Sequence, residues 1–419
     1  MKKHILIASL AAASTLFTAC NEQYGTANLA SQQATTSEGV FYTPTFAEPD
    51  DAKRLNGTPA ENLKAILEAT GPEIITSMGN MNITNEQYEE IAAFTAKLVE
   101  GKKTQKEKFN VIHNWVNGNV KYDPSDNDPY AVFTNKTGVC QGYANLLTVM
   151  CYSQDIPTVV VNGYLNQPPF YGAHAWNYVC ADGKWYVADP TNGNLQNGTW
   201  SIANISRYTH LIPEVADVDI FTDDCAIYRY YNYCINVAEV TTKENPLIVP
   251  YSVGGFVISS FNPSVALPED ITEIYLGENI TTLGESYNMS LATSNYGKYL
   301  RAIYVDKNNP SLADHEGVVY RKNGDERQLY YIPGGMEFIE MLPMKVVDKN
   351  TIYNHNSVKE IYFPKGTERL ESYAIENCPK LERIYVPEDA EVASDAIYNC
   401  PSNVEILRGV PSSIKHVTM

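Results

Sequence analysis

Six short apolar rows recur through the last third of the chain, and this repetition constrains the fold more than any other feature of the sequence. Each row follows the pattern apolar-x-x-apolar, and four rows continue as x-apolar. The rows begin at Ile271, Leu300, Leu329, Val358, Leu381 and Val404, at intervals of 29, 29, 29, 23 and 23 residues. The third row is weak because Gly334 occupies its last apolar position. A period of about 20 to 30 residues predicts a solenoid with one short strand per turn.

The rows also resemble a known family. Together with Gly284, the segment Asn-Cys-Pro-Lys-Leu at 377–381 and Val386-Pro387, they resemble extracellular leucine-rich repeats of the BspA-like type, first known from a Bacteroidales surface antigen. The resemblance covers about residues 247 to 410, with Leu247 as an early start of the array. We therefore expect residues 246–419 to form a leucine-rich-repeat solenoid.

Four tyrosines follow the central isoleucines of these rows. They are Tyr275, Tyr304, Tyr362 and Tyr385. Because side chains alternate along a strand, the four should point away from the core on one face of the solenoid. One interpretation is a strip that binds a protein or glycan, and the other is a stacked aromatic ladder that stabilises the sheet.

In the middle of the chain, Cys140 precedes an apolar stretch with helical periodicity, and Gly138 marks a turn before it. Apolar spacing also predicts helices around residues 62–67, 86–98 and 109–116. A cysteine at a helix N-terminus lies beside unpaired N–H groups and the positive end of the helix dipole, which favour the thiolate. This placement predicts a reactive sulfur.

Two aromatic and β-branched runs follow, separated by Asp182-Gly183, which predicts a two-residue hairpin turn. In that register Ala181 lies opposite Lys184, and Asp189 lies diagonal to His174 on the same face. A carboxylate there would orient the imidazole and stabilise its charged form. Taken singly, each residue is more often structural, but a cysteine, histidine and carboxylate in this arrangement are typical of nucleophilic catalysis.

These residues resemble the three motifs of the transglutaminase-like superfamily of papain-fold enzymes. The motifs are Gly138-Val139-Cys140 with Tyr143-Ala144, His174-Ala175-Trp176-Asn177, and Trp185-Tyr186 with Asp189-Pro190-Thr191, within about residues 85 to 200. The resemblance implies an α+β domain, with helices packed on an antiparallel sheet, over residues 60–245. It also implies Cys140 as nucleophile, His174 as general base and then acid, and Asp189 as orienter.

The candidates for the second donor of the implied oxyanion site are Gln141, Tyr122 and Trp115. The alternative is that these residues only pack the site, above all Trp115. The expected chemistry is acyl transfer through a thioester, with hydrolysis of peptide or amide bonds favoured over cross-linking. The expected substrates are peptides, proteins or peptidoglycan. The alternative is a catalytically silent scaffold that serves as a surface adhesin.

The N-terminus has the order of an export signal, with Lys2 and Lys3 before an apolar run at 5–17. The segment 16–20, Leu-Phe-Thr-Ala-Cys, resembles a bacterial lipoprotein signal, which implies a signal peptide at 1–19, a lipid on Cys20 and a flexible tether over 20–59. We therefore expect an extracytoplasmic protein anchored to a bacterial membrane, the outer membrane by preference.

The charge balance opposes one class of partner. The chain has 419 residues, of which 49 are acidic and 31 are Lys or Arg, so its formal net charge is -18. Such a charge repels the phosphate backbone, so we expect no nucleic-acid partner. Neither metal-ligand spacing nor a nucleotide loop occurs in the sequence, and we expect no metal or cofactor.

Overall fold

The computed structural model describes residues 32–36, 39–43, 52–71, 81–124, 126–167, 170–192, 199–201, 211–215, 218–222, 224–231, 234–262, 267–283, 297–411 and 414. They form two compact units, the first mainly Lys53–Phe221 and the second mainly Asn236–Met419. The predicted signal peptide, Cys20 and much of the predicted tether lie outside the described residues.

The first unit contains five helices among its described residues. They are α1 (Pro59–Thr70), α2 (Asn85–Leu98), α3 (Gln105–Asn119), α4 (Pro129–Asn135) and α5 (Cys140–Tyr152). The first three begin with capping boxes, in which a threonine and the Glu or Gln three residues later each bind the other's backbone N–H. The helices predicted from apolar spacing and the helix predicted to start at Cys140 are confirmed.

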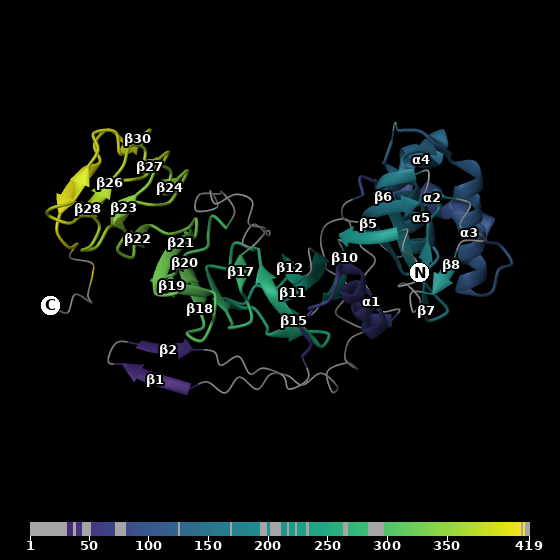
Figure 1. Ribbon diagram of the computed structural model, residues 1–419, viewed down its shortest axis with the longest axis horizontal. Helices are drawn as coiled ribbons and strands as arrows, with labels where there is room; N and C mark the ends of the chain where they lie inside the picture. Colours follow the sequence, from purple (N-terminus) through teal and green to yellow (C-terminus); the bar gives the residue numbers. More distant parts are fainter. Residues whose placement is uncertain are drawn as a thin grey trace. The chain divides into compact units, whose positions relative to one another are not determined.

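An antiparallel sheet completes this unit, in the strand order β8-β7-β6-β5-β9. Its strands are β5 (Thr158–Gln167), β6 (Phe170–Ala181), β7 (Lys184–Ala188), β8 (Thr199–Ser201) and β9 (Leu211–Val215). Helix α5 packs against β5 and β6 (Figure 1), and its apolar face joins a buried core with Phe109, Ile112 and Val179. A short parallel pair, β3 (Lys121–Tyr122) and β4 (Thr137–Gly138), precedes α5. The unit is therefore α+β, as expected.

Several strands follow this sheet or precede the first helix. The hairpin of β1 (Gln32–Thr36) and β2 (Gly39–Thr43) is antiparallel. A further sheet has the order β10-β11-β12-β15-β14, with β17 paired to β15. Its strands are β10 (Val218–Thr222), β11 (Ala226–Tyr231), β12 (Cys234–Val240), β14 (Ser252–Val253), β15 (Phe256–Phe261) and β17 (Thr282–Leu283).

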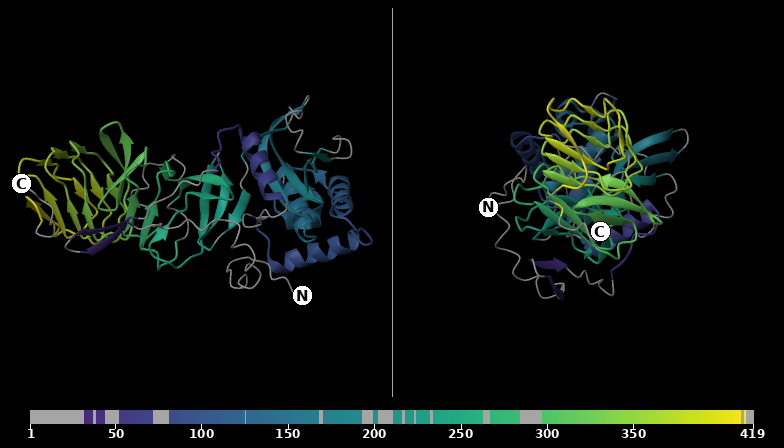
Figure 2. Two further views of the ribbon diagram at one scale, coloured as in Figure 1. Left: turned by 90° about the horizontal axis from the view of Figure 1, so that it is seen from below. Right: turned by 90° about the vertical axis from the view of Figure 1, so that its left-hand side faces the viewer.

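The second unit is a β-solenoid whose turns stack through parallel strands (Figure 2). One parallel sheet contains β13 (Leu247–Ile248), β16 (Glu273–Leu276) and β18 (Ala302–Val305), and another contains β22 (Phe338–Glu340), β25 (Glu360–Tyr362), β28 (Arg383–Val386) and β31 (Glu405–Arg408). Two more three-stranded sheets line the other sides, β23 (Val346–Val347), β26 (Arg369–Leu370) and β29 (Glu391–Val392), and β24 (Ile352–Tyr353), β27 (Ile375–Glu376) and β30 (Ile397–Tyr398). The later turns therefore contribute three short strands each, not the single strand expected.

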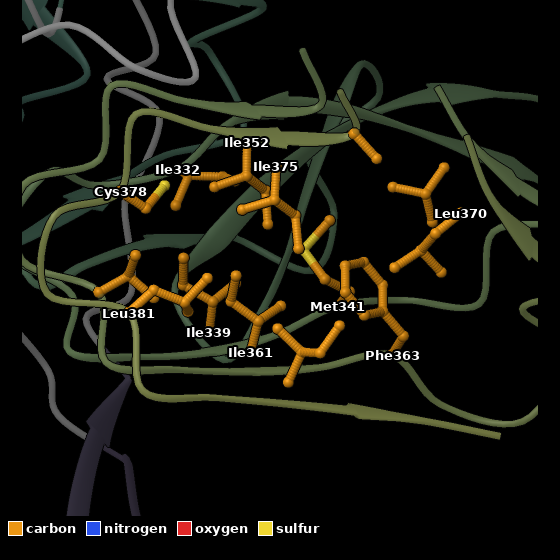
Figure 3. Close-up of a cluster of buried hydrophobic side chains, with 14 of the residues drawn as sticks. Ile332, Ile339, Met341, Ile352, Ile361, Phe363, Leu370, Ile375, Cys378 and Leu381 are labelled. Carbon is orange, nitrogen blue, oxygen red and sulfur yellow. The ribbon is translucent and has the colours of Figure 1, made fainter. Parts of the chain in front are cut away.

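Aligned aliphatic residues fill the solenoid. Ile339, Ile361 and Ile384 lie opposite one another on successive parallel strands, and all three are fully buried. Figure 3 shows Ile339 and Ile361 of this ladder beside Met341, Phe363 and other apolar side chains of the same cluster. Because each turn covers only its neighbours, stacking is what removes these side chains from water.

The structure corrects the third predicted row. Leu329 lies opposite Tyr320 in an antiparallel hairpin sheet of β19 (Leu312–His315), β20 (Val318–Asn323) and β21 (Glu326–Tyr331), so it starts no solenoid turn. The actual third row is Met336-x-x-Ile339-x-Met341, because Ile339 pairs with Ile361. An inserted hairpin thus delays the third row to 36 residues after Leu300.

The two end rows differ from expectation by register alone. Ile406 rather than Leu407 lies opposite Ile384. At the other end, Leu247 lies opposite Ile274, whereas the expected alignment placed it opposite Ile271. The array therefore does start at Leu247, with its register shifted by three residues. Short strands at the ends have few partners to specify their register.

Candidate active site

Cys140 is the first residue of α5, and the N-cap residue Val139 makes no side-chain cap. The free N–H groups of this first turn are therefore available to the sulfur. The backbone N–H groups of Gln141 and, from the sheet side, of Ala175 on β6 act on the sulfur and lower the pKa of its thiol. The half-buried thiol thus lies where helix and sheet meet.

Two glycines let the chain pack closely around this cysteine. A Cβ at Gly142 would lie 2.8 Å from Val132 Cγ2 and 2.9 Å from the Asp126 carbonyl oxygen. A Cβ at Gly138 would also lie 2.8 Å from Val132 Cγ2. Because real Cβ atoms do not approach so closely, only glycine allows α5 to begin this near to α4.

The hairpin of β6 and β7 brings His174 and Asp189 together. Ala181 lies opposite Lys184, so the predicted register is confirmed. Both turn residues have positive φ, 50° at Asp182 and 73° at Gly183, as a type I′ turn requires. The His174 Nε2 atom lies 2.7 Å from Asp189 Oδ2.

Asp189 is itself held by the backbone after it. Its Oδ1 accepts hydrogen bonds from the N–H groups of Thr191 at 3.0 Å and Asn192 at 3.2 Å. The side chain of Asp189 is 0% exposed and that of His174 is 8% exposed. A carboxylate so fixed and shielded from water acts strongly on the imidazole.

The electrostatics of the three groups agree with their geometry. Burial alone would lower the pKa of His174, but the hydrogen bonds to Asp189 and Cys140 and the charges of both raise it to about 9. Burial alone would raise the pKa of the Cys140 thiol, but the hydrogen bond and charge of His174, with the two backbone N–H groups, lower it. Because Asp189 engages Nε2, the nitrogen left for the sulfur is Nδ1. The arrangement favours a thiolate and imidazolium pair.

Asn177 braces the site, a role that the sequence analysis did not assign. This fully buried residue of β6 donates through Nδ2 to the Ala144 carbonyl at 3.1 Å and to Thr148 Oγ1 at 2.9 Å. These bonds connect the strand that carries His174 to the helix that carries Cys140. A buried amide three residues after a histidine was the only available signal, and it does not reveal the partner.

The three predicted oxyanion candidates occupy different places. Tyr122 is exposed on β3, where it lies opposite Gly138, two residues before Cys140, and burial first and the charge of Cys140 second raise its pKa. The Gln141 side chain donates to Asn145 Oδ1 at 2.8 Å, along the helix. Trp115 packs in an aromatic cluster, with its ring centroid 4.8 Å from that of Phe94.

The four predicted strip tyrosines form two pairs. Tyr275 lies opposite Tyr304, with ring centroids 4.9 Å apart, and Tyr362 lies opposite Tyr385 in the other parallel sheet. Between the pairs, β22 places Glu340 at the equivalent position.

Cys20, the predicted lipid-bearing residue, lies outside the described residues. Among the described residues, no three His, Cys, Asp or Glu side chains converge on a common metal position.

Comparison with known proteins assigns the first unit. Residues 92–190 match the family model of the transglutaminase-like superfamily. The matched range includes Cys140, His174 and Asp189 and ends at Pro190. The chain therefore contains a transglutaminase-like domain, which is followed by a β-solenoid.

Individual relatives cover only part of this chain. Human kyphoscoliosis peptidase is 28% identical to this chain over 149 aligned residues. The aligned part covers 28% of this chain and 22% of the length of the peptidase. A Cytophaga hutchinsonii structure, provisionally described as a cysteine protease, is 21% identical, covers 31% of this chain and 50% of its own, and has a TM-score of 0.25. A leucine-rich repeat protein from Eubacterium ventriosum is 17% identical, covers 39% of this chain and 41% of its own, and has a TM-score of 0.27. At such scores the two structures add nothing to the argument.

Proposed function

We propose that the transglutaminase-like domain is a thiol acyl-transfer enzyme that acts on peptide or amide bonds. The observation that carries the proposal is the imidazole of His174, which is hydrogen-bonded through Nε2 to the buried carboxylate of Asp189 and acts on the Cys140 sulfur so as to lower the pKa of its thiol. Nucleophile, base and orienter are then in contact.

In the proposed reaction the Cys140 thiolate attacks the amide carbonyl carbon, and the carbonyl oxygen becomes an oxyanion. Backbone N–H groups at the start of α5 and the hydroxyl group of Tyr122 are the candidate donors to that oxyanion. The His174 imidazolium then protonates the leaving amine as the C–N bond breaks, which leaves a thioester. Water, deprotonated by the neutral His174, attacks the thioester and releases the acid, which restores the Cys140 thiolate and the His174 imidazolium.

We favour water over an amine as the acceptor. Cys140 is only half-buried, and Tyr122, which lies opposite Gly138, is 61% exposed, which supports access of solvent to the thioester. Cross-linking would need a protected path for an amine, and no feature of the described site supports such a path. The proposed class is therefore a cysteine peptidase or amidase.

Thiol labelling tests the proposal, with activity as the second measurement. We expect the Cys140→Ala variant to lose both rapid labelling at neutral pH and the release of ammonia or amine from peptide and peptidoglycan fragments, followed by mass spectrometry. The site of labelling must be mapped, because hydrogen bonding to Cys378 also lowers the pKa of Cys400, to about 7. Cys400→Ser is thus the matched control and should keep the activity.

The outcome also separates the proposal from a second candidate, a silent scaffold that serves as an adhesin. The adhesin would be favoured by two results together. Cys140 of the wild-type protein would be labelled no faster than the remaining thiols of the Cys140→Ala variant, and the wild-type protein would turn over no fragment. The stacked solenoid supports a binding role under either function, because repeat arrays present extended surfaces.

For location, we propose export and anchoring through a lipid on Cys20, with the outer membrane preferred. The sequence order of charge, apolar run and cysteine supports this. No helix in the described part of the chain is long and apolar enough to cross a membrane.

A further inference from the structure

A cavity of about 420 Å³ lies in the solenoid, where the inserted hairpin sheet interrupts the parallel strands. One wall comes from β16 and β18, including Tyr304, and the other from β22 and the turn before it, including Phe338. Gly335 brings that turn close, because its N–H donates to the Leu300 carbonyl at 2.7 Å and a Cβ there would lie 2.7 Å from the Tyr299 backbone. The cavity thus results from the way the two sheets meet.

The walls combine apolar and aromatic surface with negative charge. Four carboxylates line the cavity, together with a single guanidinium group. They are Glu273, Glu316, Glu337 and Glu340, with Arg301. Such a mixture fits a ligand group that is cationic at its tip and apolar along its stem.

Two of the four carboxylates already have cationic partners. Glu337 pairs with Lys359 at 2.9 Å, and Glu340 lies 3.3 Å from His315 Nε2. Among the described residues, no ion pair satisfies Glu273 or Glu316. These two carboxylates line the cavity together with Tyr304. Burial raises the pKa of Tyr304 to about 12, with help from their charges.

We propose that this cavity binds a basic side chain of a polypeptide, arginine by preference. The guanidinium group would pair with Glu273 and Glu316 and stack on the ring of Tyr304. Arginine fits better than lysine because its planar group both forks onto carboxylates and stacks on aromatic rings. The site is separate from Cys140, so the proposal goes beyond the proposed enzyme activity and does not depend on it.

A small organic cation fits better than the two other obvious ligands. The described carboxylates do not converge on a metal position. A neutral glycan would leave Glu273 and Glu316 without a charge partner, and removing carboxylates from water without a partner is unfavourable.

The test is a titration of the mature chain with acetyl-Gly-Arg-Gly-amide, followed by ligand-observed NMR. The protein carries Cys140→Ala, so that no peptide is consumed. The pocket variant is the double substitution Glu273→Gln and Glu316→Gln, and the matched control is Glu326→Gln with Glu388→Gln, which removes the same charge from two exposed sites. The same peptide with citrulline in place of arginine keeps the shape and removes the charge.

We expect the dissociation constant to rise about tenfold in the pocket variant and less than about twofold in the control. Tyr304→Leu should also weaken arginine binding, by several-fold, through loss of the aromatic face. Equal losses in the pocket and control variants would overturn the proposal in favour of general acidity. Equal binding of the citrulline peptide, saturation by a neutral glycan instead, or no saturable binding of arginine would also overturn it. Thermal unfolding of each variant checks that it is folded.

Discussion

At the scale of single residues, an acidic thiol alone does not identify a nucleophile. Cys140 and Cys400 both have lowered pKa values, yet the hydrogen-bond partner of Cys400 is another thiol, whereas that of Cys140 is an imidazole with a buried carboxylate behind it. The pairing of His174 with Asp189 was predictable because the Asp182-Gly183 turn sets the register. The brace from Asn177 was not, because its partner Thr148 lies 29 residues away in the sequence.

The pH dependence of the site follows from the signs of the two pKa shifts. Because the pKa of Cys140 is lowered, the thiolate should persist as pH falls below the ordinary thiol range. Because the pKa of His174 is raised to about 9, the imidazolium should persist up to that pH. Turnover should therefore rise through the Cys140 pKa and fall near pH 9, and a pH profile of kcat/KM measures both limits.

Asp189→Asn should move the alkaline limit of that profile downward, since the His174 pKa falls without its carboxylate. It should also move the acidic limit upward, since the Cys140 thiolate is then stabilised less by a charged imidazole and the thiol pKa rises. Alkylation of Cys140 by iodoacetamide at pH 6 should slow about tenfold for each unit by which the thiol pKa rises. Asp224→Asn, at an exposed carboxylate, is the control and should leave the profile unchanged. Coincident profiles for all three proteins would show that Asp189 does not tune the pair.

At the scale of secondary-structure elements, the close packing of one element against another affects stability more than intrinsic helix propensity does. Gly142→Ala should destabilise the protein by about 1 to 3 kcal/mol, because the new methyl group meets Val132 and the Asp126 carbonyl. Gly118→Ala, in α3 with open space around it, should be neutral or stabilising by up to about 1 kcal/mol. Urea unfolding measures both, and equal effects would contradict the packing argument.

The solenoid rows could be predicted from period and aliphatic pattern, but the interruption could not. The true third row begins with Met336 and ends with Met341, and an unbranched thioether gives a weaker pattern than Leu or Ile. The hairpin sheet of β19, β20 and β21 also supplied a competing apolar row at Leu329. A local pattern does not distinguish a strand that stacks in parallel from one that turns back on its neighbour.

The isoleucine ladder allows a comparison within one column of the solenoid. Ile361→Ala should cost about 2 to 5 kcal/mol, because the fully buried side chain leaves a cavity between Ile339 and Ile384. Ile406→Ala, at a position that is 46% exposed in the last strand, should cost less than about 1 kcal/mol. If denaturant unfolding gives the two variants equal stability, the ladder is not the stabilising core.

At the scale of the whole molecule, the sequence indicated two units because two different periodicities occupy different parts of the chain. Helical spacing and hairpin signals precede residue 200, and the repeat rows follow residue 246. The acidic cavity was not predictable, because its lining comes from separate turns whose alignment depends on the inserted hairpin. The net charge of the chain indicated only the sign of the charge that a partner should carry.

The proposed membrane attachment concerns the whole chain and depends on one proposed modification, the lipid on Cys20. Cys20→Ala should move the protein expressed in a bacterium from the membrane to the soluble fraction, because no lipid could then be attached. Cys140→Ala is the control and should stay in the membrane fraction. Fractionation and the mass of the N-terminal peptide measure the result, and an unlipidated wild-type peptide would exclude the proposed anchor.

The tight turn at Asp182 and Gly183 also limits how this domain can evolve. Asp182 Oδ1 accepts the Gln105 N–H at 3.0 Å, so one of the two residues that join β6 to β7 also holds the start of α3. A one-residue insertion there would invert the pleat of β7 and carry Asp189 to the opposite side of the ribbon. In homologues that retain the chemistry, insertions and deletions should therefore accumulate in other loops and spare this turn.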